Sequence, residues 1–226
     1  MKITYYGQNC FGLETDEISI LTDPFITGNP LAKDKVDIND LKPHYIFLTH
    51  AHQDHTLDVE AIARASNAVV VCNYEIGNHF EEKGLTVQRL NHGGNLEFEF
   101  GTAKYVNAIH TSSFADGSYG GQPGGYVFVI DGKTVYMAGD TALTMDMKLI
   151  PMQFDVDISI LPVGGSLTMG VDDAIIASDF VACDKVIGCH YDTWPQLEID
   201  HEQARGKFEI KNKELILLEI GSALEL

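Results

Sequence analysis

Four side chains that commonly bind metal ions fall within six consecutive positions of this chain. They are His50, His52, Asp54 and His55. The short aromatic and apolar run 45–48 precedes them, and its length and composition predict a buried strand. His50 and His52 then leave the strand end at alternate positions, from which both imidazoles can face one point. An isolated His-x-His pair is usually structural, but this denser pattern between a strand and a helix predicts a metal site.

The length of 226 residues fits a substantial hydrophobic core, so we expect a single domain over residues 1–226. No apolar run approaches the ~18 residues that span a bilayer, and the N-terminal residues show no signal-peptide pattern. The four cysteines lie in apolar surroundings without a Cys-x-x-Cys pair, which indicates buried thiols in a reducing compartment. We therefore expect a cytoplasmic protein.

The chain is strongly acidic, with 33 acidic and 15 basic residues and a formal net charge of −18. Such a field repels nucleic acids and anionic membranes, and no basic cluster offsets it. We expect neither as a partner. A small-molecule substrate is the expected partner, and an anionic one is compatible with this charge because a divalent metal pair dominates its own pocket.

Strand patterns alternate with helical patterns along the sequence. Helices are predicted at residues 57–66, 73–83, 171–182 and 202–212, with Thr56 as the cap of the first. Strands are predicted at residues 3–6, 11–14, 18–21, 45–48, 68–72, 104–109, 134–138, 157–163, 185–189 and 215–220. This alternation indicates an α/β layered fold.

Three more ligand-type residues follow predicted strands. They are His110 (after residues 104–109), Asp140 (after 134–138) and His190 (after 185–189). The carboxyl ends of strands are where α/β folds place their sites. Each residue alone is weak evidence, but together with the first cluster they form a set.

Several other features have two interpretations each. Asp23, at a predicted strand end, is either a turn residue or an anchor for the metal loop. Residues 113–125 are rich in Gly and Ser and predict a long mobile loop, either a lid or a surface excursion. His92 either faces the pocket or belongs to an ordinary loop. Tyr191 and Trp194 either line the pocket mouth or are buried aromatic residues.

The order of these residues resembles the metallo-β-lactamase superfamily of metal-dependent hydrolases, over the whole chain. The resemblance rests on Asp23, His50, His52, Asp54, His55, His110, Asp140 and His190. Residues 23–30, 138–141 and 190–194 resemble a small stand-alone branch related to ascorbate-6-phosphate lactonase and N-acylphosphatidylethanolamine phospholipase D. The family implies a four-layer αβ/βα sandwich, with two mixed sheets face to face and helices outside. Related lactonases form oligomers, which implies a homo-oligomer here.

The resemblance also implies a role for each residue. One ion would be held by His50, His52 and His110, and a second by Asp54, His55 and His190, with Asp140 bridging the two. Asp54 and Asp140 would be the catalytic carboxylates, whereas Asp23 would anchor the loop without binding metal. Mixed nitrogen and oxygen ligands suit Zn²⁺ or Mn²⁺, with Fe²⁺ or Ni²⁺ as further options. The implied reaction is cleavage of a small phosphoester or lactone by a hydroxide that both ions share.

One position departs from the pattern of this branch. The loop after the first strand usually carries Gly-His there, whereas this chain has Gly7 and Gln8. Because that position tends to lie near the metals, Gln8 either weakens an outer contact or changes the substrate. Two other functions compete with the dinuclear hydrolase: a di-iron oxidoreductase with a similar ligand set, and a metal-binding module without catalysis.

Overall fold

The chain forms two seven-stranded sheets, and the computed structural model describes all of residues 1–226. Sheet A has the strand order β14 (Ala223–Glu225), β1 (Lys2–Gly7), β2 (Cys10–Glu14), β3 (Ser19–Thr22), β4 (Tyr45–Phe47), β5 (Val69–Cys72) and β6 (Val87–Arg89). Sheet B has the order β13 (Glu214–Ile216), β12 (Lys185–Cys189), β11 (Ile158–Pro162), β10 (Lys133–Met137), β9 (Gly124–Ile130), β8 (Gly101–Asn107) and β7 (Asn95–Phe98). Both sheets mix parallel and antiparallel pairs, as expected.

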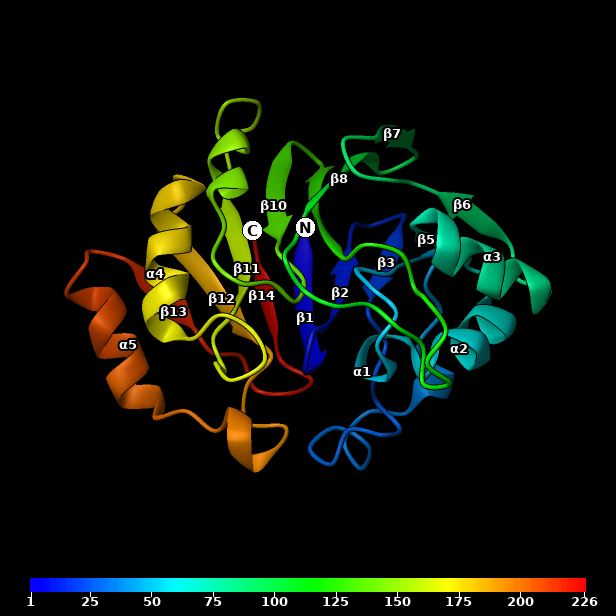
Figure 1. Cartoon of the computed structure of the whole chain (residues 1–226), viewed down its shortest axis with the longest axis horizontal. Coiled ribbons are helices and arrows are strands. Elements are labelled where there is room, and N and C mark those ends of the chain that lie inside the picture. The colour runs from blue at the N-terminus through cyan, green and yellow to red at the C-terminus, as the bar shows by residue number, and fades with distance from the viewer.

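Helices lie on the outer sides of the two sheets (Figure 1). On the side of sheet A are α2 (Val59–Ser66) and α3 (Tyr74–Glu82), and on the side of sheet B are α4 (Val171–Phe180) and α5 (His201–Glu209). The short helices are α1 (Gln53–Thr56), η1 (Ile38–Asp40), η2 (Met145–Leu149) and η3 (Pro195–Leu197). This arrangement confirms the predicted four-layer αβ/βα sandwich. None of the helices combines the length and apolar character needed to cross a bilayer.

Aromatic side chains fill the space between the sheets. Phe47 on β4 lies edge-on to Tyr126 and Phe128 on β9, with ring centroids 5.1 and 4.9 Å apart. The Tyr126 hydroxyl donates to the carbonyl of Leu48 at 2.9 Å, so this buried polar group also has a partner in the facing sheet. The end of β4 is therefore fixed against sheet B directly before the histidine cluster.

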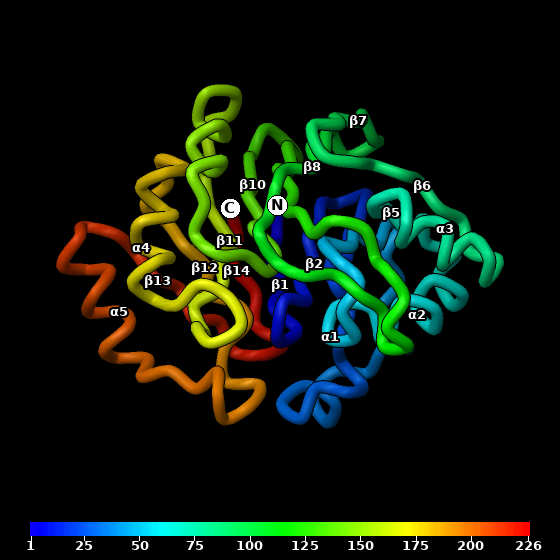
Figure 2. Tube along the Cα trace, in the orientation of Figure 1, coloured from blue at the N-terminus to red at the C-terminus, as the bar shows by residue number.

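The two ends of the chain meet in sheet A, where β14 pairs with β1 in an antiparallel ladder (Figure 2). The sequence did not predict β14. The predicted strand at 215–220 is shorter, because only Glu214–Ile216 pairs with β12. The chain then turns at Gly221, which has a φ of +88°, and forms β14 beside β1.

The helix predicted at 57–66 begins two residues later, as α2, and the separate short helix α1 precedes it. Thr56 ends α1 instead of capping α2, because its hydroxyl donates to the carbonyls of Ala51 and His52. The residue that precedes α2 is Asp58, and its carboxylate accepts from the backbone N–H groups of Ile26 and Thr27 at 2.6 and 2.9 Å. The cap prediction was wrong because the Thr56 hydroxyl bonds within its own turn, and the Asp58 carboxylate is used by a loop more than 30 residues away.

Residues 113–125 make specific contacts with the rest of the fold, and the last two of them begin β9. Ser112 Oγ donates to the carbonyl of Gly120 at 3.0 Å and accepts from the N–H of Ala51 at 3.1 Å. The ring of Phe114 stacks on His79 of α3, with centroids 3.8 Å apart. These contacts favour a fixed excursion over a lid.

Phe47 provides a test of the packing between the sheets. Changing Phe47→Ala removes a fully buried ring from a close-packed core, so we expect a loss of about 3–5 kcal/mol in the free energy of unfolding. Urea unfolding followed by circular dichroism measures this loss. Ile210→Ala is the control, since Ile210 is 80% exposed and its truncation should change stability by less than about 0.5 kcal/mol. Equal effects of the two changes would contradict this description of the core.

Candidate metal centre

The ligand-type residues lie close together because the strands that precede them have their C-terminal ends on the same side of each sheet. In sheet B, β8 and β10 are both antiparallel to β9 and therefore run the same way, and β12 runs parallel with them through β11. The C-terminal ends of these three strands therefore lie on the same side of sheet B, and they are followed by His110, Asp140 and His190. In sheet A, β3 and β4 are parallel, so Asp23 and His50 also leave a common edge.

The structure brings all seven proposed ligands together in two groups. The first group contains His50, His52 and His110, and the second contains Asp54, His55, Asp140 and His190. Within each group the potential ligand atoms lie within 4.8 Å of one another. Residues 140 positions apart in sequence therefore face one small volume, as the strand ends predicted.

Asp140 lies between the two groups. Its Oδ2 atom is 3.9 Å from the Nε2 atom of His50 and 3.5 Å from that of His110, both in the first group. The same oxygen is 3.4 Å from Nε2 of His55 and 3.0 Å from Nε2 of His190, in the second group. One carboxylate oxygen thus faces four imidazoles from both groups, which is the placement that a bridging ligand requires.

Protonation differs between the two groups. Burial is the main cause that lowers the pKa of His50, His52 and His110. Burial works in the same direction at His190, but the neighbouring Asp140 carboxylate outweighs it and raises the pKa of His190 to about 9. In the metal-free form, the imidazoles of the first group are therefore neutral at pH 7, whereas His190 in the second group is protonated.

The carboxylates respond in the opposite sense. Burial opposes ionisation of Asp54 and Asp140, but the neighbouring imidazoles prevail. His55 lowers the pKa of Asp54 below its ordinary value, and His190 with His55 lowers that of Asp140 well below it. Both carboxylates are therefore ionised at neutral pH, which is the form that binds a cation.

The donor set fits divalent metal ions. Five imidazoles and two carboxylates supply the nitrogen and oxygen ligands of zinc and manganese sites. Nε2 of His55, which lies 3.4 Å from both Asp54 and Asp140, is buried without a hydrogen-bond partner, and so is Oδ1 of Asp140. Buried polar atoms are normally paired, so unpaired ones at the meeting point of the ligands are an independent sign of an ion.

Outer contacts orient the imidazoles. The buried Asp23 accepts from Asn9 Nδ2 at 2.6 Å, from the N–H of Thr49 at 2.8 Å and from the Thr49 hydroxyl at 2.6 Å. Its Oδ2 also lies 2.9 Å from Nδ1 of His55, which leaves Nε2 of that ring facing the centre. His50 uses Nδ1 in the same way, at 3.0 Å from the Thr49 hydroxyl. Such carboxylate–histidine pairs fix ring direction and tautomer at metal sites.

Of the remaining candidates, Gln8 contacts a potential ligand, whereas Tyr191 and Trp194 pack against other aromatic side chains. Gln8 is fully buried, and its Nε2 donates to Oδ2 of Asp54 at 2.9 Å. Tyr191 does not line a pocket mouth: its ring stacks on Tyr5 in the core and its hydroxyl donates to the carbonyl of Leu218. Trp194 is half-buried and lies against Phe25, with centroids 6.0 Å apart.

The other histidines have structural partners. His92 Nε2 lies 2.9 Å from the carbonyl of Pro123, and His92 lines a cavity of 280 Å³ that includes none of the seven ligands. His201 Nε2 contacts Oδ2 of Asp192 at 2.6 Å. Sequence reasoning gave no role to Thr49 and Thr193, whose hydroxyls contact His50 and Gln8, because only their positions one residue before His50 and three residues after His190 mark them.

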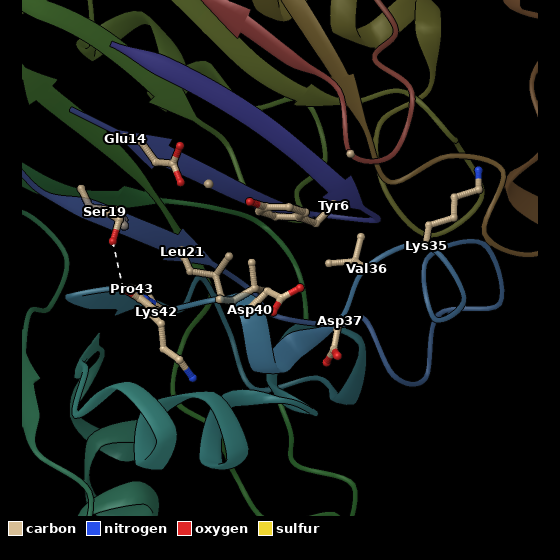
Figure 3. A pocket seen from close by; sticks show the side chains of 14 residues that line it. Tyr6, Glu14, Ser19, Leu21, Lys35, Val36, Asp37, Asp40, Lys42 and Pro43 are labelled. Carbon is tan, nitrogen blue, oxygen red and sulfur yellow. Dashed lines mark hydrogen bonds between the residues drawn. The ribbon is translucent and has the colours of Figure 1, made fainter. Parts of the chain in front are cut away.

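A larger cavity lies elsewhere. It has a volume of 470 Å³ and is bounded by β1, β2, β3 and residues 35–43, with Tyr6, Leu21 and Val36 on its walls (Figure 3). Glu14, Asp37, Lys35 and Lys42 mix both charges around it. It contains no residue of either metal-ligand group. This cavity is therefore separate from the cluster of potential ligands at the strand ends.

Asp23→Asn tests the outer contacts. The amide keeps the size of the carboxylate but loses acceptor capacity where four donors converge, so His55 should lose its fixed orientation. We expect Zn²⁺ affinity of the second group to fall about 10–100-fold, measured by isothermal titration calorimetry. Asp34→Asn, at an exposed carboxylate, is the matched control. Unchanged binding in Asp23→Asn would refute this role.

The metal-free protein should lose stability at alkaline pH. The pKa of His190 is about 9 in the folded form and ordinarily 6.5, so its contribution is fully present below pH 6.5 and disappears as the pH rises through 9. The shift corresponds to on the order of 3 kcal/mol. Thermal unfolding of chelator-treated protein between pH 6 and 10 measures the loss, and His190→Gln should reduce it, with His55, whose pKa the same carboxylates raise, accounting for the rest. A flat profile for the wild type would contradict the described charge pattern.

Known proteins resemble this chain in sequence and in fold. A family profile described as a beta-lactamase superfamily domain matches residues 2–190. A UPF0173 metal-dependent hydrolase of Christiangramia forsetii is 66% identical over 226 residues, which cover 100% of both chains. The structure of Igni18, a metallo hydrolase from the archaeon Ignicoccus hospitalis, is 31% identical with a TM-score of 0.89, covering 100% of this chain and 98% of that one.

A more distant structure extends the likeness of the fold. The isothiocyanate hydrolase from Delia radicum gut bacteria has a TM-score of 0.81 at 20% identity, with 100% of this chain and 99% of that chain covered. At that identity the likeness shows the fold alone. From the profile match and the identity to full-length relatives, the chain belongs to the UPF0173 metal-dependent hydrolases of the metallo-β-lactamase superfamily.

Proposed function

We propose that this metal-dependent hydrolase cleaves a small phosphoester or lactone at a dinuclear centre. The observation that carries the proposal is the position of Asp140, whose Oδ2 faces imidazoles of both ligand groups. His50, His52 and His110 would hold one ion, and Asp54, His55 and His190 the other. Zn²⁺ and Mn²⁺ both suit these donors.

The bound ions would supply Lewis acidity, which lowers the pKa of a water and stabilises developing negative charge. The protein's own residues fix the arrangement. Asp140 and Asp54 bring two negative charges to a cluster of neutral imidazoles, and Asp23 holds His55 in the tautomer that presents Nε2. The Asp54 side chain is 20% exposed and that of His110 is 15% exposed, so the centre is open to solvent on their side.

A small anionic substrate fits this proposal better than a polymer. The formal net charge of −18 opposes the approach of any polyanion, and the repulsion grows with the length of the polymer. Close to the centre, two divalent cations would reverse the sign of the local field. A compact phosphoester or lactone experiences that local field without requiring a basic surface around it.

Asp140→Ala tests the dinuclear centre. The chain, freed of metal by chelation and reloaded with Zn²⁺ or Mn²⁺, should bind two ions and hydrolyse bis(p-nitrophenyl) phosphate or a simple lactone. Loss of the shared carboxylate should lower turnover by more than about 100-fold, beyond the range typical of outer contacts. Asp155→Ala, at an exposed carboxylate, should retain wild-type turnover. Fewer than two ions per wild-type chain, measured by mass spectrometry, would end the proposal.

A further inference from the structure

The loop between β1 and β2 contacts the second ligand group through two consecutive side chains. Gln8 reaches Asp54 directly, with its Nε2 2.9 Å from Oδ2. Asn9 reaches His55 indirectly, because its Nδ2 donates to the carboxylate of Asp23 that contacts the His55 ring. One short loop thus braces two ligands that come from α1.

Both ends of the Gln8 amide are used. An ionised carboxylate only accepts hydrogen bonds, so the NH₂ end of Gln8 faces Asp54. The carbonyl end then accepts from the hydroxyl of Thr193, in the segment that follows His190. The side chain is fully buried, so water does not replace either partner. Gln8 therefore ties the helix that carries Asp54 to the loop that carries His190.

The backbone of Gln8 adds a third connection. Its carbonyl accepts from the N–H of His190 at 2.9 Å. Its φ is +53°, in the left-handed region that residues other than glycine rarely adopt. Such a conformation persists where surrounding contacts fix it, and here it lets the carbonyl face His190 while the side chain faces Asp54.

The first ligand group has different outer partners. His50 Nδ1 contacts the Thr49 hydroxyl at 3.0 Å, and His52 Nε2 lies 3.3 Å from the Thr111 hydroxyl. Neither contact involves Gln8. Gln8 therefore contacts two ligands of the second group, and none of the described hydrogen bonds joins it to His50, His52 or His110.

We propose that Gln8 is a positioning residue that sets the affinity of the second ligand group for its ion, separately from the first. By fixing Oδ2 of Asp54 at 3.4 Å from Nε2 of His55 and 3.5 Å from Nε2 of His190, its neutral amide holds three ligand atoms in one arrangement. The inference rests on the proposed dinuclear function, whose own test is the number of ions bound by the wild type.

Gln8→Met tests this role, because Met keeps the length and removes both hydrogen-bonding ends. Metal-free protein is titrated with Zn²⁺ by calorimetry, and bound zinc is counted by mass spectrometry. We expect the first ion to bind with wild-type affinity and the second about 10–100-fold more weakly. Turnover should fall at limiting Zn²⁺ and recover at high Zn²⁺, which a general loss of structure would not allow.

Gln88→Met is the matched control, since Gln88 is exposed on β6, and it should bind both ions as the wild type does. If Gln8→Met does not fold, Thr193→Val removes the contact at the other end of the amide and should also weaken only the second ion. Equal weakening of both ions, or of neither, would overturn the role of Gln8. A wild type that binds fewer than two ions would instead overturn the proposed function, before any variant is made.

Discussion

The buried carboxylate of Asp140 is the constraint on which this site depends. A charged group out of contact with water needs compensating partners, and here four imidazoles from both sheets supply them within 3.9 Å. Three of those imidazoles are themselves buried, so the carboxylate and its partners share one water-free interior. The arrangement of the potential metal ligands therefore depends on how the two sheets pack against each other.

The two sheets solve this problem by geometry. Strands that run the same way end at one edge, so a ligand placed after each of them arrives at the same place without a long loop. Phe47 and Tyr126 fix the distance between the sheets a few residues before the ligands begin. Because close-packed interiors deform little, that distance is transmitted to the imidazoles.

Much of this arrangement could be predicted from the sequence. Apolar runs that end in His110, Asp140 and His190 carry their own signal, since strand and ligand lie next to each other in the chain. The start of α2 could not be predicted, because Asp58 is engaged by the loop at Ile26. The strand β14 was also missed, since only its pairing with β1 gives it an identity. Features set by neighbouring residues can be predicted from a single sequence, whereas contacts between residues far apart in the sequence cannot.

The two ligand groups differ in how they are supported, and the difference follows from charge. The first group is made of imidazoles, which are neutral when they bind metal and need only hydroxyl partners such as Thr49 and Thr111. The second contains Asp54 and shares Asp140, so it concentrates negative charge that must be oriented without being cancelled. Neutral donors meet that demand. A lysine or arginine in place of Gln8 would satisfy Asp54 but compete with the cation, whereas an amide directs the carboxylate and leaves its charge available.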